Sequence, residues 1–274
     1  MSFPWNGSKR WLLSFIEDEL ECFSPTRYLE PFAGSGNVSR RVRALWPEVP
    51  QVIGDANPWL GSFYERQVSD TRSYELPSKV CDYVYWRSLR DSDLSSLTLH
   101  ERVLRFAVCL TTAWGNRWKT EIEGHFTNSS TPVNVKFTGE EYIRERVQLI
   151  LKDEWLQPGR DQVLIGDWST VVKRASPGDL VFLDPPYPET LGYGNQTWTI
   201  SNMLDVIDWI TEATSTGIHV IATNVGDVER LYRRAGLRTR LIPCPTKSNT
   251  RRARVELLAS SSRETGGLVE LFRK

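Results

Sequence analysis

An acidic residue, two prolines and an aromatic residue follow one another at Asp184-Pro185-Pro186-Tyr187, directly after the apolar run 180–183. That run predicts a buried strand, and the tetrapeptide would lie at its carboxyl end, where open α/β sheets bind ligands. Prolines fix the backbone and lack N–H donors. Asp184 and the Pro185 carbonyl could then accept both hydrogens of an exocyclic amine, while the Tyr187 ring offers a stacking face. A proline-terminated edge strand with a core tyrosine is the alternative interpretation.

A glycine loop, Gly34-Ser35-Gly36, lies between a predicted strand and a predicted helix. Such a loop lets a ligand approach backbone amides at a helix N-terminus. Asp55 follows nineteen positions after Gly36, at the end of the next predicted strand, where a carboxylate can accept hydrogen bonds from ribose hydroxyls. The full G-x-G-x-x-G pattern is absent, so a simple tight turn is the alternative to a nucleotide site.

Taken together, D-P-P-Y and the loop 32–36 resemble the motifs of Dam-type (alpha group, D12 class) S-adenosylmethionine-dependent DNA adenine N6-methyltransferases. The order of the motifs, with a long insertion before D-P-P-Y, is also similar to that of the alpha group. Five further segments resemble elements of the family: Pro4 to Lys9, Leu29 to Phe32, Asp55 to Asn57, Gly166 to Trp168 and Arg251 to Leu258.

This resemblance implies a set of functional residues. The adenine amine would donate to Asp184 and the Pro185 carbonyl, and Tyr187 would stack on the base after it flips out of double-stranded DNA. S-adenosylmethionine is the implied cofactor, and the chemistry requires no metal. The implied cofactor-binding residues are Trp5, Lys9, Phe32, Gly34, Gly36, Asp55, Asp167 and Trp168. Among these, Lys9 would pair with the cofactor carboxylate, Asp55 with the ribose and Asp167 with the adenine.

The chain departs from the family pattern in two regions. Asn6 and Ser8 replace small residues of the segment Pro4 to Lys9, the lysine element. The insertion matches the family only loosely at 114–118 and 124–128, so the recognised sequence is not carried over. Three alternatives stay open. The first is methylation of cytosine N4, although such enzymes more often have serine in place of Asp184. The second is methylation of adenine N6 in RNA, although the related RNA enzymes commonly have asparagine at that position. The third is a catalytically silent nucleic-acid-binding module.

Alternating strand and helix patterns surround these motifs. They predict a Rossmann-like methyltransferase fold of the α/β class, with a mainly parallel sheet and helices on both faces. The last two strands are joined without a helix and predict an antiparallel edge hairpin. Helices are expected over 9–22, 39–46, 202–213 and 228–235, and strands over 27–30, 51–55, 162–165, 180–183, 218–223, 237–242 and 253–258.

The middle of the chain breaks this alternation. Residues 60–158 predict a mostly helical inserted domain, with helices near 79–89, 100–113 and 140–151. Residues 1–59 and 159–274 would then form the S-adenosylmethionine-binding catalytic domain. In the family that this chain resembles, such an insertion recognises the target sequence.

Charge and composition limit the classes of partner that we expect for this chain. The net charge is zero, with 34 basic and 34 acidic residues. The segment 227–254 alone, however, has nine basic residues and only two acidic ones, which predicts a local phosphate-binding face. Arg117, Lys247, Arg251 and Arg252 are the candidate nucleic-acid contacts. No membrane-length apolar run, secretory leader or CxxC pair occurs, so we expect a cytoplasmic protein with neither membrane partner nor metal. Without a nuclease motif, a restriction endonuclease partner would be a separate protein.

Overall fold

A seven-stranded sheet is the centre of the computed structural model, which describes residues 3, 5, 8–69, 76, 78, 92–112, 140–191, 197–245 and 255–262. The strand order is β3-β2-β1-β4-β7-β9-β8. The strands are β1 (Tyr28–Glu30), β2 (Gln51–Asp55), β3 (Gln162–Ile165), β4 (Leu180–Leu183), β7 (His219–Val225), β8 (Arg238–Pro243) and β9 (Val255–Ser260). All neighbours from β3 to β7 are parallel, whereas β9 is antiparallel to both β7 and β8. The predicted Rossmann-like α/β fold with an antiparallel edge is confirmed.

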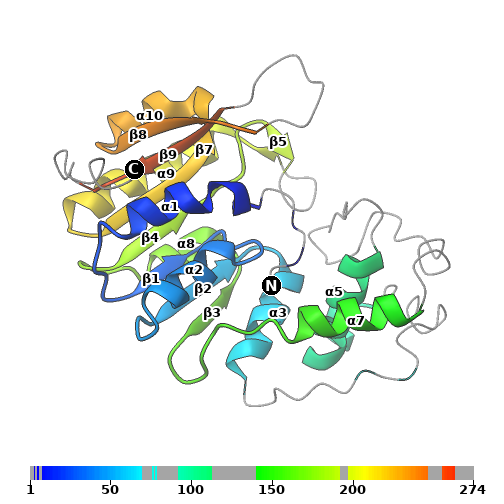
Figure 1. Cartoon of the computed structure of the whole chain (residues 1–274). Coiled ribbons are helices and arrows are strands. Elements are labelled where there is room, and N and C mark those ends of the chain that lie inside the picture. Colours follow the sequence, from blue (N-terminus) through cyan, green and yellow to red (C-terminus); the bar gives the residue numbers. More distant parts are fainter. Residues whose placement is uncertain are drawn as a thin grey trace, which may run out of the picture.

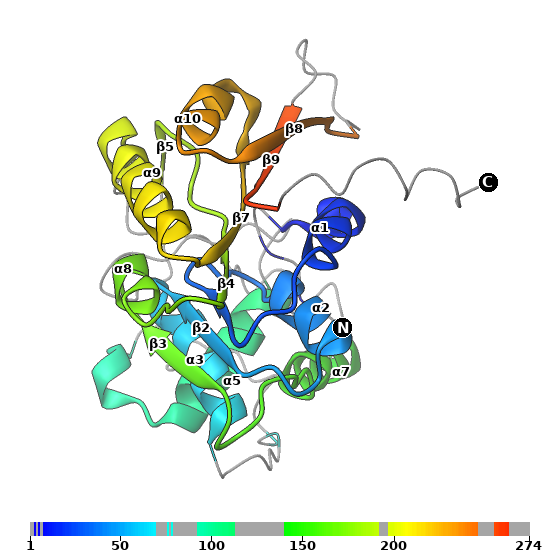
Figure 2. The same cartoon turned by 90° about the vertical axis from the view of Figure 1, so that its left-hand side faces the viewer.

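Helices cover both faces of this sheet. They are α1 (Leu13–Leu20), preceded by a 3-10 turn at Arg10–Leu12, α2 (Asn37–Leu45), α8 (Trp168–Val172), α9 (Ile200–Ser215) and α10 (Glu229–Arg234). Figure 2 shows α1 and α2 on one side of the sheet and α8 and α9 on the other. Successive strand residues point to opposite faces. In β4, accordingly, Leu180 and Phe182 belong to one buried apolar cluster and Val181 and Leu183 to the other.

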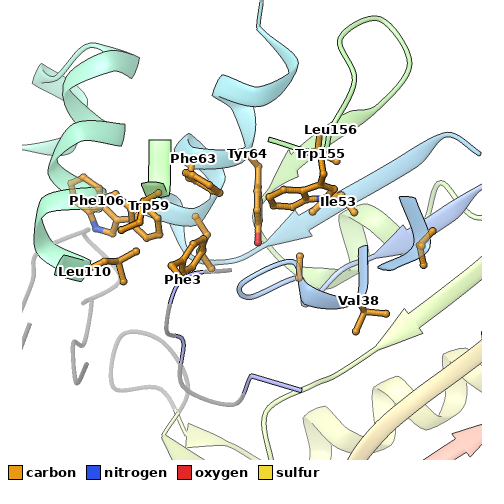
Figure 3. Packing of buried hydrophobic residues seen from close by; sticks show 14 of the residues in the cluster. Phe3, Val38, Ile53, Trp59, Phe63, Tyr64, Phe106, Leu110, Trp155 and Leu156 are labelled. Carbon is orange, nitrogen blue, oxygen red and sulfur yellow. The ribbon is translucent and has the colours of Figure 1, made fainter. Parts of the chain in front are cut away.

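The cluster on the α1 and α2 side continues into the insertion. Three helices contribute to it: α3 (Pro58–Val68), α5 (Leu99–Thr112) and α7 (Glu140–Leu151), which lie beside the sheet in Figure 1. Aromatic rings of Phe3, Phe63 and Phe106 meet with centroids 5.3 to 5.6 Å apart, as Figure 3 shows. The predictions over 100–113 and 140–151 are confirmed, and the helix expected near 79–89 lies outside the described residues.

Helix α3 was not predicted from the sequence, although its start has a clear signal. The Asn57 side chain accepts hydrogen bonds from the amides of Trp59 and Leu60, and Pro58 occupies the first helical position. The helix runs across the expected domain boundary at 59–60 and packs on β2, β3 and α5. The division into a catalytic domain and an insertion therefore stays a prediction, and α3 belongs to both packing units.

The two connections of the insertion to the core lie next to each other. Arg66, near the end of α3, donates to the carbonyl of Leu151 at 2.5 Å and pairs with Glu154 at 2.9 Å. The Gln67 side-chain oxygen accepts from the amides of Trp155 and Leu156. Side chains of α3 thus join the segment that leaves the sheet for the insertion to the segment that returns from it.

Two short strands, β5 (Thr190–Leu191) and β6 (Thr197–Trp198), form an unpredicted hairpin after the D-P-P-Y segment. Capping by Asp167 begins α8, which was also not predicted. In the part of the chain that the structure describes, no helix is both long and apolar enough to cross a membrane.

Candidate active site

The carboxyl ends of β1 and β4 form the centre of the candidate site. These strands pair side by side, yet the chain continues from β1 toward β2 and from β4 toward β7, in opposite directions across the sheet. Such a switch in strand order opens the crevice where α/β proteins bind ligands. It brings together the glycine loop after β1 and the D-P-P-Y segment after β4.

The glycine loop requires its glycines. Gly34 and Gly36 have φ values of 51° and 66°, in the left-handed region that favours glycine. A Cβ at Gly36 would lie 2.4 Å from the Trp155 ring, and one at Gly34 would lie 3.1 Å from the Trp5 indole nitrogen. Trp5, predicted to bind the cofactor, is thus in place directly beside the loop.

Asp55 connects β2 to this loop. Its carboxylate is buried and accepts hydrogen bonds from the amide of Gly34 at 2.9 Å and from the amide of Asn57 at 2.8 Å. Burial raises the pKa of Asp55 from 3.8 to about 6, although both hydrogen bonds oppose the rise. Because each carboxylate oxygen has more than one lone pair, the group can still accept from a ligand hydroxyl.

The lysine element bridges the two strand ends. Ser8 accepts a hydrogen bond from the Asn37 side chain at the start of α2. The next residue, Lys9, is buried and places its Nζ 2.7 Å from Oδ1 of Asp184. The same Nζ lies 5.5 Å from the centre of the Tyr187 ring. Lys9, predicted for the cofactor carboxylate, thus contacts the predicted amine acceptor in this structure.

Two buried side chains that the sequence analysis did not select contact the D-P-P-Y segment. The Thr223 hydroxyl, on β7, donates to Asp184 Oδ1 at 2.8 Å. The Tyr187 hydroxyl donates to the carboxylate of Glu256, on β9, with distances of 2.6 and 2.8 Å to its two oxygens. Glu256 lies within the 251–258 segment that resembles the family, which was the available signal, and Thr223 ends a predicted strand.

A third carboxyl group is buried behind the site. Glu30, the last residue of β1, is 2% exposed and accepts a hydrogen bond from the Tyr28 hydroxyl at 3.0 Å. Burial raises its pKa from 4.5 to about 8, against the lowering effect of that hydrogen bond. Glu30 therefore keeps its proton to a higher pH than an ordinary surface glutamate.

Aromatic rings gather beside the glycine loop. Phe32 and Trp168 are stacked with centroids 6.2 Å apart and an interplanar angle of 21°, and Trp198 meets Phe32 edge-on. Asp167 is exposed, and its side chain accepts from the amide of Ser169 at the start of α8. The predicted adenine-contacting residues, Asp167 and Trp168, are therefore on the same side as the glycine loop.

The expected phosphate-binding face lies only partly within the described residues. Arg117, Lys247, Arg251 and Arg252 lie outside the described residues. Of the other arginines in 227–254, Arg238 pairs with Glu19 at 2.5 Å, and the Arg240 guanidinium covers the Phe15 ring at 4.8 Å. These two side chains attach the edge hairpin to α1. Among the described residues, no three His, Cys, Asp or Glu side chains gather as metal ligands.

Comparisons with known proteins point to one family. Residues 5–235 match the family model of D12 class N6 adenine-specific DNA methyltransferase. The chain is 26% identical over 257 residues to the type II methyltransferase M1.LlaDCHI of Lactococcus lactis subsp. cremoris. This match covers 84% of this chain and 83% of that protein. It is 32% identical over 88 residues to the DNA N-6-adenine-methyltransferase of Escherichia phage P1, a match covering 29% of this chain and 12% of that protein. A precorrin-6y C5,15-methyltransferase structure from Geobacter metallireducens GS-15 aligns with 93% of this chain and 90% of its own, at 9% identity and a TM-score of 0.41.

Proposed function

Since the chain belongs to the D12 class of N6 adenine-specific DNA methyltransferases, we propose that it transfers a methyl group from S-adenosylmethionine to the N6 amine of an adenine flipped out of duplex DNA. The observation that carries the proposal is the meeting of Lys9, Asp184 and Tyr187 beside the glycine loop, at the switch between β1 and β4. These groups supply a cation, an acceptor and a stacking ring within one crevice.

The chemistry of the glycine-loop side fits S-adenosylmethionine. Lys9 supplies a cation for a carboxylate, buried Asp55 supplies an acceptor for ribose hydroxyls, and Phe32 and Trp168 supply rings beside a carboxylate at Asp167. Trp5 approaches Gly34 so closely that a Cβ there would lie 3.1 Å from the indole nitrogen, and the φ of Gly34 also favours glycine. When bound, S-adenosylmethionine supplies an electrophilic methyl group on a sulfonium centre.

The D-P-P-Y side would prepare the amine. The lone pair of adenine N6 is delocalised into the ring, so the nitrogen is a poor nucleophile. Hydrogen bonds from N6 to Asp184 and to the Pro185 carbonyl favour a pyramidal nitrogen, and the negative charge of Asp184 stabilises the positive charge that develops there. Tyr187 stacks on the base, and much of the acceleration is positioning. N6 is not accessible to such a pocket inside a duplex, so the base flips out.

The remaining roles follow from the family. The insertion would recognise the target sequence, and Arg117, Lys247, Arg251 and Arg252 would contact DNA phosphates. The L. lactis relative is named a type II methyltransferase, and for this chain we propose a cytoplasmic enzyme with a separate restriction endonuclease as partner.

One experiment tests this function directly. The purified protein is incubated with unmethylated duplex DNA and methyl-labelled S-adenosylmethionine, and the DNA is digested to nucleosides for mass spectrometry. We expect labelled N6-methyladenine with the natural chain and none with Asp184→Ala. Labelled N4-methylcytosine would overturn the assignment of the base. If the protein binds the cofactor but no label enters DNA, the same assay is carried out on RNA. If RNA is not labelled either, the protein is a catalytically silent binding module.

A further inference from the structure

Both ends of the D-P-P-Y segment are hydrogen-bonded to side chains of β7 and β9, the two strands between which the sheet changes from parallel to antiparallel pairing. Thr223 lies near the end of β7 and is fully buried, and Glu256 lies near the start of β9 and is 4% exposed. These strands pair antiparallel with Val225 opposite Glu256, so both side chains belong to the same end of the sheet. In the sheet, β7 lies between β4 and β9 (Figure 1).

We propose that Thr223 and Glu256 are positioning residues for methyl transfer: Thr223 fixes the Asp184 carboxylate, and Glu256 fixes the Tyr187 ring, from strands β7 and β9. The inference rests on the proposed function, because it concerns the geometry of the amine pocket. Neither residue needs to touch the base or the cofactor to have this role.

The contacts of Asp184 define the role of Thr223. Among the described residues, the two polar partners of this carboxylate are the Thr223 hydroxyl at 2.8 Å and Lys9 Nζ at 2.7 Å, and both contact Oδ1. Two partners on one oxygen fix the plane of the carboxylate and direct Oδ2 to a different side. A hydroxyl is needed for this, because a methyl group in its place cannot donate to Oδ1.

Burial of Glu256 supports a role beyond folding. A carboxylate at 4% exposure loses its hydration, which costs free energy unless hydrogen bonds compensate. An apolar residue of similar size often stabilises a buried position as well as an ionic group does. One compensating hydrogen bond comes from the hydroxyl of Tyr187, the ring proposed to stack on the base. Such charge-assisted bonds are short and directional, so they hold the hydroxyl end of the Tyr187 ring in one place.

Matched variants separate positioning from folding. Thr223→Val removes the hydroxyl at nearly constant shape, and Thr223→Ser keeps it. Glu256→Leu removes the acceptor, and Glu256→Gln keeps one acceptor oxygen. We expect the Val and Leu variants to lower the single-turnover rate of methyl transfer by about 10- to 100-fold, the equivalent of one hydrogen bond to a charged group. The Ser and Gln variants should stay within about fivefold of the natural chain.

A second measurement shows whether Glu256 acts through Tyr187. With Tyr187→Phe already present, Glu256→Leu should lower the rate less than about twofold further, because the shared hydrogen bond is absent. Titration calorimetry should give an S-adenosylmethionine dissociation constant within about threefold of the natural value in every variant. If Glu256→Leu does not fold, Tyr187→Phe alone tests the shared hydrogen bond, because it keeps the ring and removes the donor, and it should lower the rate by about 10- to 100-fold.

The outcomes distinguish the inference from the function on which it rests. A natural chain that makes no labelled N6-methyladenine contradicts the proposed function. A natural chain that methylates adenine while folded Thr223→Val and Glu256→Leu keep its rate overturns the inference alone. Equal losses in cofactor affinity and rate would also overturn it, because they would indicate general damage to the site.

Discussion

The two halves of the active site hold their functional groups by different means. On the glycine-loop side, the contacts involve main-chain atoms: the Gly34 and Asn57 amides donate to Asp55, and the Tyr64 hydroxyl donates to the Gly34 carbonyl. On the D-P-P-Y side they join side chains, from Lys9 and Thr223 to Asp184 and from Tyr187 to Glu256.

This difference indicates how each half responds to substitution. The positions of main-chain atoms are set by the path of the loop, so the glycine-loop side depends on φ values and on space for a backbone without side chains. The D-P-P-Y side depends on the chemical identity of each partner. We therefore expect the rate of methyl transfer to respond mainly to the second half, and stability and cofactor affinity to the first.

The largest expected effect is on the D-P-P-Y side. Asp184→Asn removes the charge that faces the amine and should lower kcat by about 10²- to 10³-fold, with a smaller change in cofactor affinity. Asp55→Asn is the matched control, and it should weaken cofactor binding while kcat at saturation changes less than about tenfold. Steady-state kinetics on unmethylated DNA measures both variants. Similar losses of kcat in the two would contradict the proposed separation of roles.

The next effect tests the main-chain side. Gly36→Ala should lower the free energy of unfolding by about 1–2 kcal/mol for the left-handed backbone. A further cost of about 1–3 kcal/mol should come from the contact with Trp155. Urea denaturation measures the sum of these two costs as the change in the free energy of unfolding. Gly159→Ala is the control, since Gly159 has φ 74° and no atom lies within 4 Å of its added Cβ. Equal destabilisation of both variants would show that the contact with Trp155 has no cost.

Cofactor affinity should depend on pH through Asp55. The pKa of this carboxyl is raised to about 6, so below that pH the protonated group accepts hydrogen bonds less well. The S-adenosylmethionine dissociation constant should fall about tenfold between pH 5 and pH 7, because protonation competes with binding. Calorimetric titration at several pH values, repeated with Asp55→Asn, isolates the contribution. An unchanged slope in that variant would assign the titration to another group.

The same pKa shift has the opposite consequence for folding. A carboxyl whose folded-state pKa is higher than its unfolded value binds protons more tightly when folded. The contribution of Asp55 to the free energy of unfolding is therefore largest below about pH 4 and decreases as the pH rises to about 6. Binding and stability thus change in opposite directions over this window.

The smallest expected effect concerns Asp167. Asp167→Ala removes the cap of α8 and should lower the free energy of unfolding by about 0.5–2 kcal/mol. Asp167→Asn keeps a good cap and should preserve stability, while weakening cofactor affinity by a few-fold through the lost charge. Thermal unfolding measures the effect of each variant on stability, and titration calorimetry measures its effect on cofactor affinity. If both variants bind the cofactor like the natural chain, Asp167 serves α8 alone.

The sequence allowed the fold to be predicted because local patterns determine it. Strands 162–165 and 180–183 and helix 140–151 are observed with the predicted bounds, since apolar periodicity and turn residues act over short distances. Helix α3 was missed because the Asn57-Pro58 start signal lies at the place where the insertion was expected to begin.

The side-chain partners in the site could not be predicted in the same way. Lys9 and Asp184 are distant in sequence, and their contact depends on β1 lying next to β4. The contacts of Thr223 and Glu256 depend likewise on the order of β4, β7 and β9. Motifs in the sequence select candidate groups for the chemistry, whereas the side chains that contact those groups become visible only with the strand order.

The adjacent connections of the insertion have a consequence for evolution and engineering. Because Arg66 and Gln67 join the outgoing chain to the segment 151–156, the sheet receives its two connections at one place, whatever lies between them. A replacement for residues 69–150 would have to cover the rings that now pack on Phe106, which are Phe3, Trp5 and Phe63. Under the proposed role of the insertion in target recognition, exchange of this one segment between relatives would change the sequence preference and leave the residues at the ends of β1 and β4 in place.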